Sequence, residues 1–300
     1  MNRYIILIKL VISTGYMFSQ NYVDVLKLSG ITTPDNVFDS SSVKTKITEI
    51  NADLTVPIKV NTNTTIITGL IYETIETKLF SDATAKRFGS TTLKIGANKV
   101  FNEKWSGTLI ALPKIASDYQ SWSNKDFQMG AIGIMKFTKR DNLNFKFGMY
   151  YNTELFGPFF VPMLGMYYQS PNKKFETTIM APLAADVNYQ LLSFMNVGCN
   201  FNGQIRSYHL NNSTPLNKST YVARSTNELF GYLKFNITKS FSVQTKIGHS
   251  FGRTYKIYDE TDKVTCGLPA TFIGNKRRQL NTNFSNGFIY QVTLLYRINL

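Results

Sequence analysis

The last stretch of the chain, residues 284–300, alternates between apolar and polar side chains. The apolar or aromatic positions are Phe288, Tyr290, Val292, Leu294, Tyr296, Ile298 and Leu300. The residues between them are mostly polar, with Ile289 and Leu295 as exceptions. Because side chains on a strand point to alternate faces, this pattern predicts a strand with one apolar and one mostly polar face. A chain built from many such strands is typical of a membrane barrel, with lipid outside and polar groups inside.

The N-terminus predicts export from the cytoplasm. Residues 1–19 combine Arg3, an apolar run at 4–12 interrupted by Lys9, and small residues before a cut after Ser19. These are the features of a secretory signal peptide, so we expect residues 20–300 to form the barrel domain. After residue 19 no run of 18 or more uncharged apolar residues occurs, and we therefore expect no transmembrane helix.

Further alternating segments along the chain predict antiparallel hairpins. In 49–60, for example, Ile50, Leu54 and Ile58 alternate with polar residues such as Glu49 and Asp53. The expected short turns lie at 61–64, 102–104, 139–142, 171–174, 192–194 and 239–240, with longer loops between them. Short periplasmic turns and longer extracellular loops characterise bacterial barrels, whose strand number is even. We predict an all-β, antiparallel up-and-down transmembrane barrel of about 14 strands, with 12 as the alternative.

Several segments together resemble a known group of proteins. They are Phe18-Ser19-Gln20, Ala52-Asp53-Leu54-Thr55-Val56-Pro57-Ile58, Gly69-Leu70-Ile71-Tyr72-Glu73, Leu112-Pro113 and Tyr189-Gln190. The chain resembles outer-membrane-barrel-like families of Bacteroidetes that are described as domains of unknown function. The resemblance implies a barrel in the outer membrane and implies no activity.

The residues available for catalysis or metal binding are few. The chain has only two histidines and two cysteines, and no Cys or His cluster has zinc spacing. Ser207 and His209 lie two residues apart on one predicted strand, so they share a face and form a weak candidate for a catalytic pair facing lipid. The polar end of a strand leaving the membrane explains them more simply. We therefore expect no enzymatic activity, no metal and no cofactor.

The alternation of side chains along the strands predicts a lumen lined with basic residues. The inward-facing cations are expected to be Lys94, Lys136, Lys146, Arg206, Lys234, Lys246 and Lys256, with Glu154 and Asp53 or Glu49 as the main inward acids. A basic lumen favours anions. An alternative is that these charges pair with one another in a closed lumen.

A separate basic group lies in the long loop before the last strand. Lys276, Arg277 and Arg278 could contact lipopolysaccharide phosphates, or could simply be solvated. Nucleic-acid binding is not expected, because the basic residues are spread over the strands and the signal directs the chain outward.

These observations predict a protein of the cell outer membrane and leave three functions open. The first is a passive pore or solute-binding barrel with a basic, anion-preferring lumen. The second is a plugged structural or surface-interaction barrel, and the third is a lipid-modifying enzyme. The expected partners are outer-membrane lipid, lipopolysaccharide, an anionic solute and, through the last strand, the barrel-assembly machinery.

Overall fold

Fourteen strands form a closed antiparallel ring in the computed structural model, which describes residues 22–39, 41–211 and 218–299. The predicted signal peptide, 1–19, lies outside the described residues. The ring strands are β1 (Tyr22–Thr32), β4 (Thr48–Lys59), β5 (Thr64–Thr77), β6 (Lys86–Val100), β7 (Trp105–Ser117), β8 (Phe127–Arg140), β9 (Leu143–Glu154), β10 (Gly157–Gln169), β11 (Phe175–Ala181), β12 (Ala184–Leu192), β13 (Met195–Leu210), β14 (Thr220–Asn236), β15 (Phe241–Asp259) and β18 (Phe288–Asn299).

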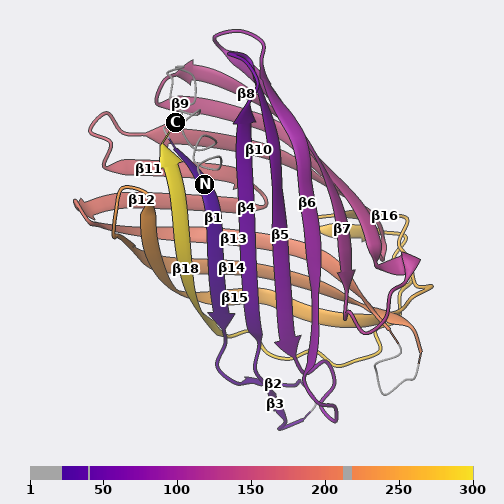
Figure 1. Ribbon diagram of the computed structural model, residues 1–300. Helices are drawn as coiled ribbons and strands as arrows, with labels where there is room; N and C mark the ends of the chain where they lie inside the picture. Colours follow the sequence, from indigo (N-terminus) through magenta and orange to yellow (C-terminus); the bar gives the residue numbers. More distant parts are fainter. Residues whose placement is uncertain (1–21, 40, 212–217, 300) are drawn as a thin grey trace, which may run out of the picture.

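The ring closes through backbone pairing of the first and last strands. Tyr22 of β1 lies opposite Asn299 of β18, and the pairing continues to Thr32 opposite Tyr290 (Figure 1). The strands β10 and β11 are paired as well, so each ring strand has a partner on both sides. The prediction of 14 strands is confirmed, and the alternative of 12 is wrong. Among the described residues, no helix is long and apolar enough to cross a membrane.

The outer surface of the ring is apolar, as the alternation predicted. In β18, Phe288, Tyr290 and Val292 are exposed, whereas Ile289 and Thr293 on the opposite face are buried. In β4, Ile50 has 57% of its surface exposed and its neighbour Glu49 only 4%. Apolar side chains therefore face outward over the middle of the strands, which is the arrangement of a lipid-facing barrel wall.

The two ends of the ring differ. One end carries short turns and both described ends of the chain, and we call it the short-turn end (Figure 1). The other, the loop end, carries the segment 33–47 with β2 (Asn36–Val37) and β3 (Lys44–Thr45), and the segment 118–126 with the 3-10 helix η2 (Asn124–Asp126). It also carries 260–287 with β16 (Cys266–Leu268) and β17 (Thr271–Ile273).

One connection at the loop end is shorter than the pattern suggested. The segment 156–160 reads as an apolar loop in the sequence, but β10 already begins at Gly157 and only 155–156 form the turn. The connection between β11 and β12 is 182–183. The strands β11 and β12 are short, so the barrel wall is low at this position.

Three long strands leave the wall above this low section. The strand β13 pairs with β12 only as far as Asn202 opposite Ala184, and its last residues continue without β12. At His209 it pairs in parallel with Ser117 of β7, a strand from another part of the ring. In Figure 1, β13, β14 and β15 pass behind β4–β6 at a large angle to them and reach the side where β7 lies. We call the ends of these strands, residues 203–210, 220–226 and 253–259, the plug.

A charge on the lipid-facing surface should destabilise this fold. Ile95 points outward in the middle of β6 and is 55% exposed, whereas Asn98 of the same strand points inward and donates a hydrogen bond to Thr108. Ile95→Arg should cost about 2–4 kcal/mol, the typical penalty of arginine near the membrane midplane. Asn98→Arg, the matched control, should cost much less. Equal losses in equilibrium unfolding from lipid vesicles would contradict the outward orientation of Ile95.

Candidate functional site

The plug lies between two parts of the barrel wall. One face packs against β5 and β6, in an apolar cluster that includes Ile75, Phe88, Tyr208, Val222 and Ile257. The other face packs against β8, β9 and β10, in a second cluster around Phe156, Phe159, Val161 and Tyr221. Side chains from both parts of the wall therefore meet the plug, which fills the loop end of the lumen.

A β-bulge in β15 helps this strand to bend from the wall into the lumen. The register between β14 and β15 shifts between Ser225 and Asn227, and Gly252 has a φ of +62° there. This left-handed conformation favours glycine, and bulges bend a strand and increase its twist. The bulge also reverses the alternation, so that Arg253, Tyr255 and Ile257 are the buried positions that follow it.

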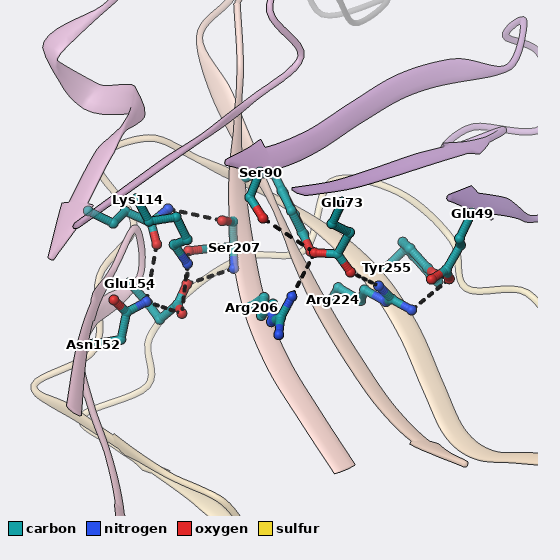
Figure 2. Close-up of polar contacts among 12 residues, drawn as sticks. Glu49, Glu73, Ser90, Lys114, Asn152, Glu154, Arg206, Ser207, Arg224 and Tyr255 are labelled. Atoms are coloured by element: carbon teal, nitrogen blue, oxygen red, sulfur yellow. Dashed lines mark hydrogen bonds and ion pairs between the residues drawn. The ribbon is translucent and has the colours of Figure 1, made fainter. Parts of the chain in front are cut away.

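Arg224 of β14 is the central charge on the first face of the plug. Its Nη1 lies 2.7 Å from Glu73 Oε1, and its Nη2 lies 2.6 Å from Glu49 Oε1. All three side chains are almost completely buried (Figure 2). One guanidinium thus binds carboxylates from β4 and β5, the part of the wall that this face covers, and its planar shape suits that double contact.

Glu73 has further partners on β13. Its Oε2 accepts hydrogen bonds from Arg206 Nη1 at 2.8 Å and from Tyr208 Oη at 2.7 Å. Because Arg206 and Tyr208 lie two residues apart, they point to the same face of the strand and reach one carboxylate. A second hydroxyl, that of Ser90 on β6, donates to the same oxygen at 3.4 Å.

Glu154 of β9 binds the opposite face of the plug. Its Oε2 accepts hydrogen bonds from the Ser207 hydroxyl at 2.5 Å and from the Ser207 backbone N–H at 2.7 Å. Its Oε1 lies 3.4 Å from Lys114 Nζ and also accepts from the Asn152 amide (Figure 2). Each of the carboxylates Glu49, Glu73 and Glu154 therefore has a cationic partner, as burial of a charge requires.

The half of the lumen near the short-turn end has a different electrostatic character. It carries Lys94, Lys136, Lys146, Lys234 and Lys246, all on the inward face and only partly exposed or buried. Lys136 and Lys146 lie directly opposite each other on β8 and β9. The inward acids in this half are Asp24, Asp53, Glu176 and Asp186, of which Asp53 binds Lys94 and Asp24 binds Arg297. Cations outnumber these acids.

The structure separates the predicted basic residues into three groups. Lys94, Lys136, Lys146, Lys234 and Lys246 lie on the inward faces of their strands, and Lys246 donates to Asn200 at 3.1 Å. Arg206 also points inward but belongs to the plug, where it binds Glu73. Lys256 follows the bulge at Gly252, so it lies on the face of β15 opposite to Tyr255 and Ile257, on the same side as Tyr258 of the second cluster, and it is partly exposed.

The predicted pair of Ser207 and His209 does not exist as a pair. The two residues share a face, but that face is buried inside the barrel instead of lying in lipid. Ser207 binds Glu154, whereas His209 Nδ1 lies 2.7 Å from Asp126 Oδ1 and its Nε2 lies 2.8 Å from Ser219 Oγ. The alternation along the strand correctly placed both residues on one face. It could not show that β13 leaves the wall, so that this face lies inside the barrel.

The basic loop is only partly available to a partner. The Arg277 guanidinium lies over three rings, at 4.5 Å from Tyr258, 4.7 Å from Phe272 and 5.3 Å from Phe156. It is therefore enclosed by aromatic side chains and is not a solvated cation. Lys276 and Arg278 are exposed.

Sequence reasoning missed Glu73 and Arg224, which organise the plug. Arg224 and Lys234 are an even number of residues apart on β14, so they point to the same face. The inward direction of Arg224 could therefore be predicted together with that of Lys234. Glu73 lies in 65–80, where the alternation is blurred. Within the described parts of the chain no group of three or more His, Cys, Asp or Glu residues could hold a metal ion, and Cys199 and Cys266 are free thiols.

The family of the chain follows from comparison with known families. The model described as a domain of unknown function (DUF6268) matches residues 9–291. The chain belongs to this family. The resemblance to barrel families of unknown function is confirmed to this extent, and an origin in Bacteroidetes stays a prediction. No curated protein matches this DUF6268 chain.

Three of the solved structures similar to this DUF6268 protein have low sequence identity to it. An outer membrane channel from Pseudomonas putida F1 has 8% identity and a TM-score of 0.46, covering 92% of this chain and 95% of that one. The P. putida toluene transporter TodX has 9% identity and a TM-score of 0.40, covering 92% and 89%. The NanC porin has 9% identity and a TM-score of 0.37, covering 91% and 100%. The barrel fold itself rests on the strand pairing described above.

Removing Arg224 should destabilise the protein strongly. Arg224→Ala leaves Glu49 without its cation and removes one of two from Glu73, in a buried site where breaking an ion pair costs about 3–5 kcal/mol. Arg87→Ala is the matched control, since Arg87 binds Glu76 at 2.7 Å on the surface and should contribute less than about 1 kcal/mol. Denaturant unfolding of both variants measures the difference. Equal losses would show that Arg224 has no special structural role.

Proposed function

We propose that this protein is an outer-membrane barrel that binds small anionic solutes in the short-turn half of its lumen and is sealed at the loop end by the plug. The plug carries this proposal. Its two faces bind Glu73 and Glu154, which belong to different parts of the wall, and the side chains around these contacts are buried. A barrel with such a plug has a lumen that is closed at one end, so it can bind a solute but is not a permanently open pore.

The outer-membrane location is supported by the surface of the ring. Exposed apolar side chains such as Leu93, Ile247 and Leu294 cover its outside, and they would be unfavourable in water over so large an area. Because short turns and chain ends lie on the periplasmic side of bacterial barrels, the basic half of the lumen would face the periplasm. The strand β18 would then present the C-terminal signal to the assembly machinery.

Anion binding is supported by the pairing of like charges. Lys136 and Lys146 lie directly opposite each other and both face the lumen, which is unfavourable for two cations on neighbouring strands. A bound anion would relieve that repulsion. Lys234 and Lys246 add positive charge to the same half of the lumen, and a low-dielectric wall strengthens the field of such a group.

A second contact, between the loop end and lipopolysaccharide, has less support. Lys276 and Arg278 are exposed there and would contact its phosphates, whereas Arg277 is held by the aromatic rings. The apolar outer surface would contact the acyl chains of the membrane.

Anion binding should depend on the facing lysines. Lys146→Ala should weaken the binding of inorganic phosphate or sulfate to the refolded protein about tenfold, or ~1.4 kcal/mol, because one facing charge is lost. Isothermal titration in detergent measures this change. The matched control is Lys239→Ala in the exposed turn between β14 and β15, which should bind as the unaltered chain does.

Two outcomes would contradict the proposal in different ways. A large, steady current from the unaltered protein in a planar bilayer would show that the plug does not seal the lumen. Absence of anion binding, together with a silent bilayer, would favour the alternative of a plugged structural barrel.

A further inference from the structure

Three side chains at the loop end form a hydrogen-bonded series that the proposed anion binding does not use. His209 is at the end of β13, Asp126 is the last residue of η2, and Ser219 directly precedes β14. Nδ1 of His209 lies 2.7 Å from Asp126 Oδ1, and Nε2 lies 2.8 Å from Ser219 Oγ. A hydroxyl, an imidazole and a carboxylate connected in this order are the arrangement that activates a serine nucleophile.

The base and the carboxylate are held rigidly. His209 and Asp126 are each 2% exposed, and the His209 carbonyl accepts a hydrogen bond from the Asp118 N–H at 3.0 Å. The second oxygen of Asp126 accepts the Ser123 N–H at 3.0 Å in a capping box, which leaves Oδ1 directed at the imidazole. When neutral His209 donates Nδ1–H to Asp126, its Nε2 lone pair is directed at Ser219, the tautomer that a general base requires.

The serine is more accessible than its partners. Ser219 is partly exposed, and its single hydroxyl proton can go to either of two acceptors, His209 Nε2 or the Glu260 carboxylate, which binds Lys125 Nζ at 2.5 Å. Hydrogen bonds from Lys125 and Ser219 hold the pKa of the Glu260 carboxyl below its usual value, so this group is an anion at neutral pH. The Glu260 carboxylate therefore contacts both the Lys125 ammonium and the Ser219 hydroxyl, which brings the ammonium near the serine oxygen.

We propose that Ser219, His209 and Asp126 form a hydrolase site for carboxylic esters at the loop end of the barrel. Ser219 Oγ attacks the ester carbonyl while His209 Nε2 takes its proton. The C–O bond to the alcohol then breaks, and His209 returns the proton to the departing alcohol. Water attacks the acyl-serine, His209 takes a proton from that water, and the carboxylic acid leaves as Ser219 regains its proton. Lys125 stabilises the negative charge on the carbonyl oxygen, and Asp126 is a positioning residue.

This site is independent of the anion-binding lumen. It uses none of the lysines of the short-turn half, and it uses the opposite side of β13 from the Arg206 and Tyr208 contacts to Glu73. It also replaces the predicted partner Ser207, whose hydroxyl is held by Glu154. Loss of phosphate binding would therefore leave this proposal standing, and loss of hydrolysis would leave the lumen proposal standing.

A fluorophosphonate probe tests the site on the refolded full chain. The expected result is a covalent adduct on Ser219, located by mass spectrometry, and slow hydrolysis of p-nitrophenyl butyrate. Ser219→Ala should abolish the adduct at this position, and His209→Gln should slow labelling about a hundredfold or more, the usual contribution of a general base. Asp126→Asn should lower kcat and leave KM unchanged. Ser193→Ala, an exposed serine in a short turn, is the matched control and should react normally.

A second variant distinguishes catalysis from a merely structural hydrogen-bond network. Glu260→Ala removes the carboxylate that competes with His209 for the serine proton, so labelling of Ser219 should increase. A network in which Glu260 only holds the serine in place would instead lose labelling. Heat-modifiable migration on gels confirms that each variant is folded. An unlabelled Ser219 in folded protein, or equal labelling in His209→Gln, would overturn the proposal.

Discussion

Closure of the backbone hydrogen bonds determines the rest of this structure. In lipid no water is available for an unpaired N–H or C=O, so a sheet can cross the membrane only if its first and last strands pair. The pairing of β1 with β18 fulfils that condition, and it sets the alternation of every strand in the ring. One set of faces must then be apolar and the other can carry charges such as Lys94 and Glu49.

The same condition explains how the plug can exist. Where β13 leaves the wall it loses its partner β12, and its free edge must find other donors and acceptors. Part of that need is met by β7, since the Asp118 N–H donates to the His209 carbonyl. The charges that enter with the plug are matched by carboxylates on the wall it meets, Arg224 by Glu49 and Glu73, for example. Without these pairs the inserted charges would be buried at a high cost.

Much of the fold could be predicted because a period of two is a strong local signal. Strands such as β18 and β4, the strand number and the outward apolar face all follow from alternation and turn residues. The plug could not be predicted, because it depends on how far β11 and β12 extend compared with β13, and that is a relation between distant segments. The position of Lys256 has a local cause, since one bulge at Gly252 reverses every later position of β15. The partners of His209 come from η2 and from the residue before β14, and neither the spacing nor the parity of β13 indicates them.

The position of the β13 end inside the barrel can be measured by cysteine cross-linking. With Cys199 and Cys266 replaced by serine, Ser117→Cys and His209→Cys would be combined, since these residues are register partners on β7 and β13. Disulfides require Cα atoms within about 4.4–6.8 Å, which paired strands provide. We expect a disulfide in the folded protein, as in a Val197→Cys/Leu233→Cys positive control on the neighbouring strands β13 and β14, and none in Ser117→Cys/Ser193→Cys. If the positive control forms its disulfide and the Ser117–His209 pair does not, β13 remains in the wall and the plug does not exist.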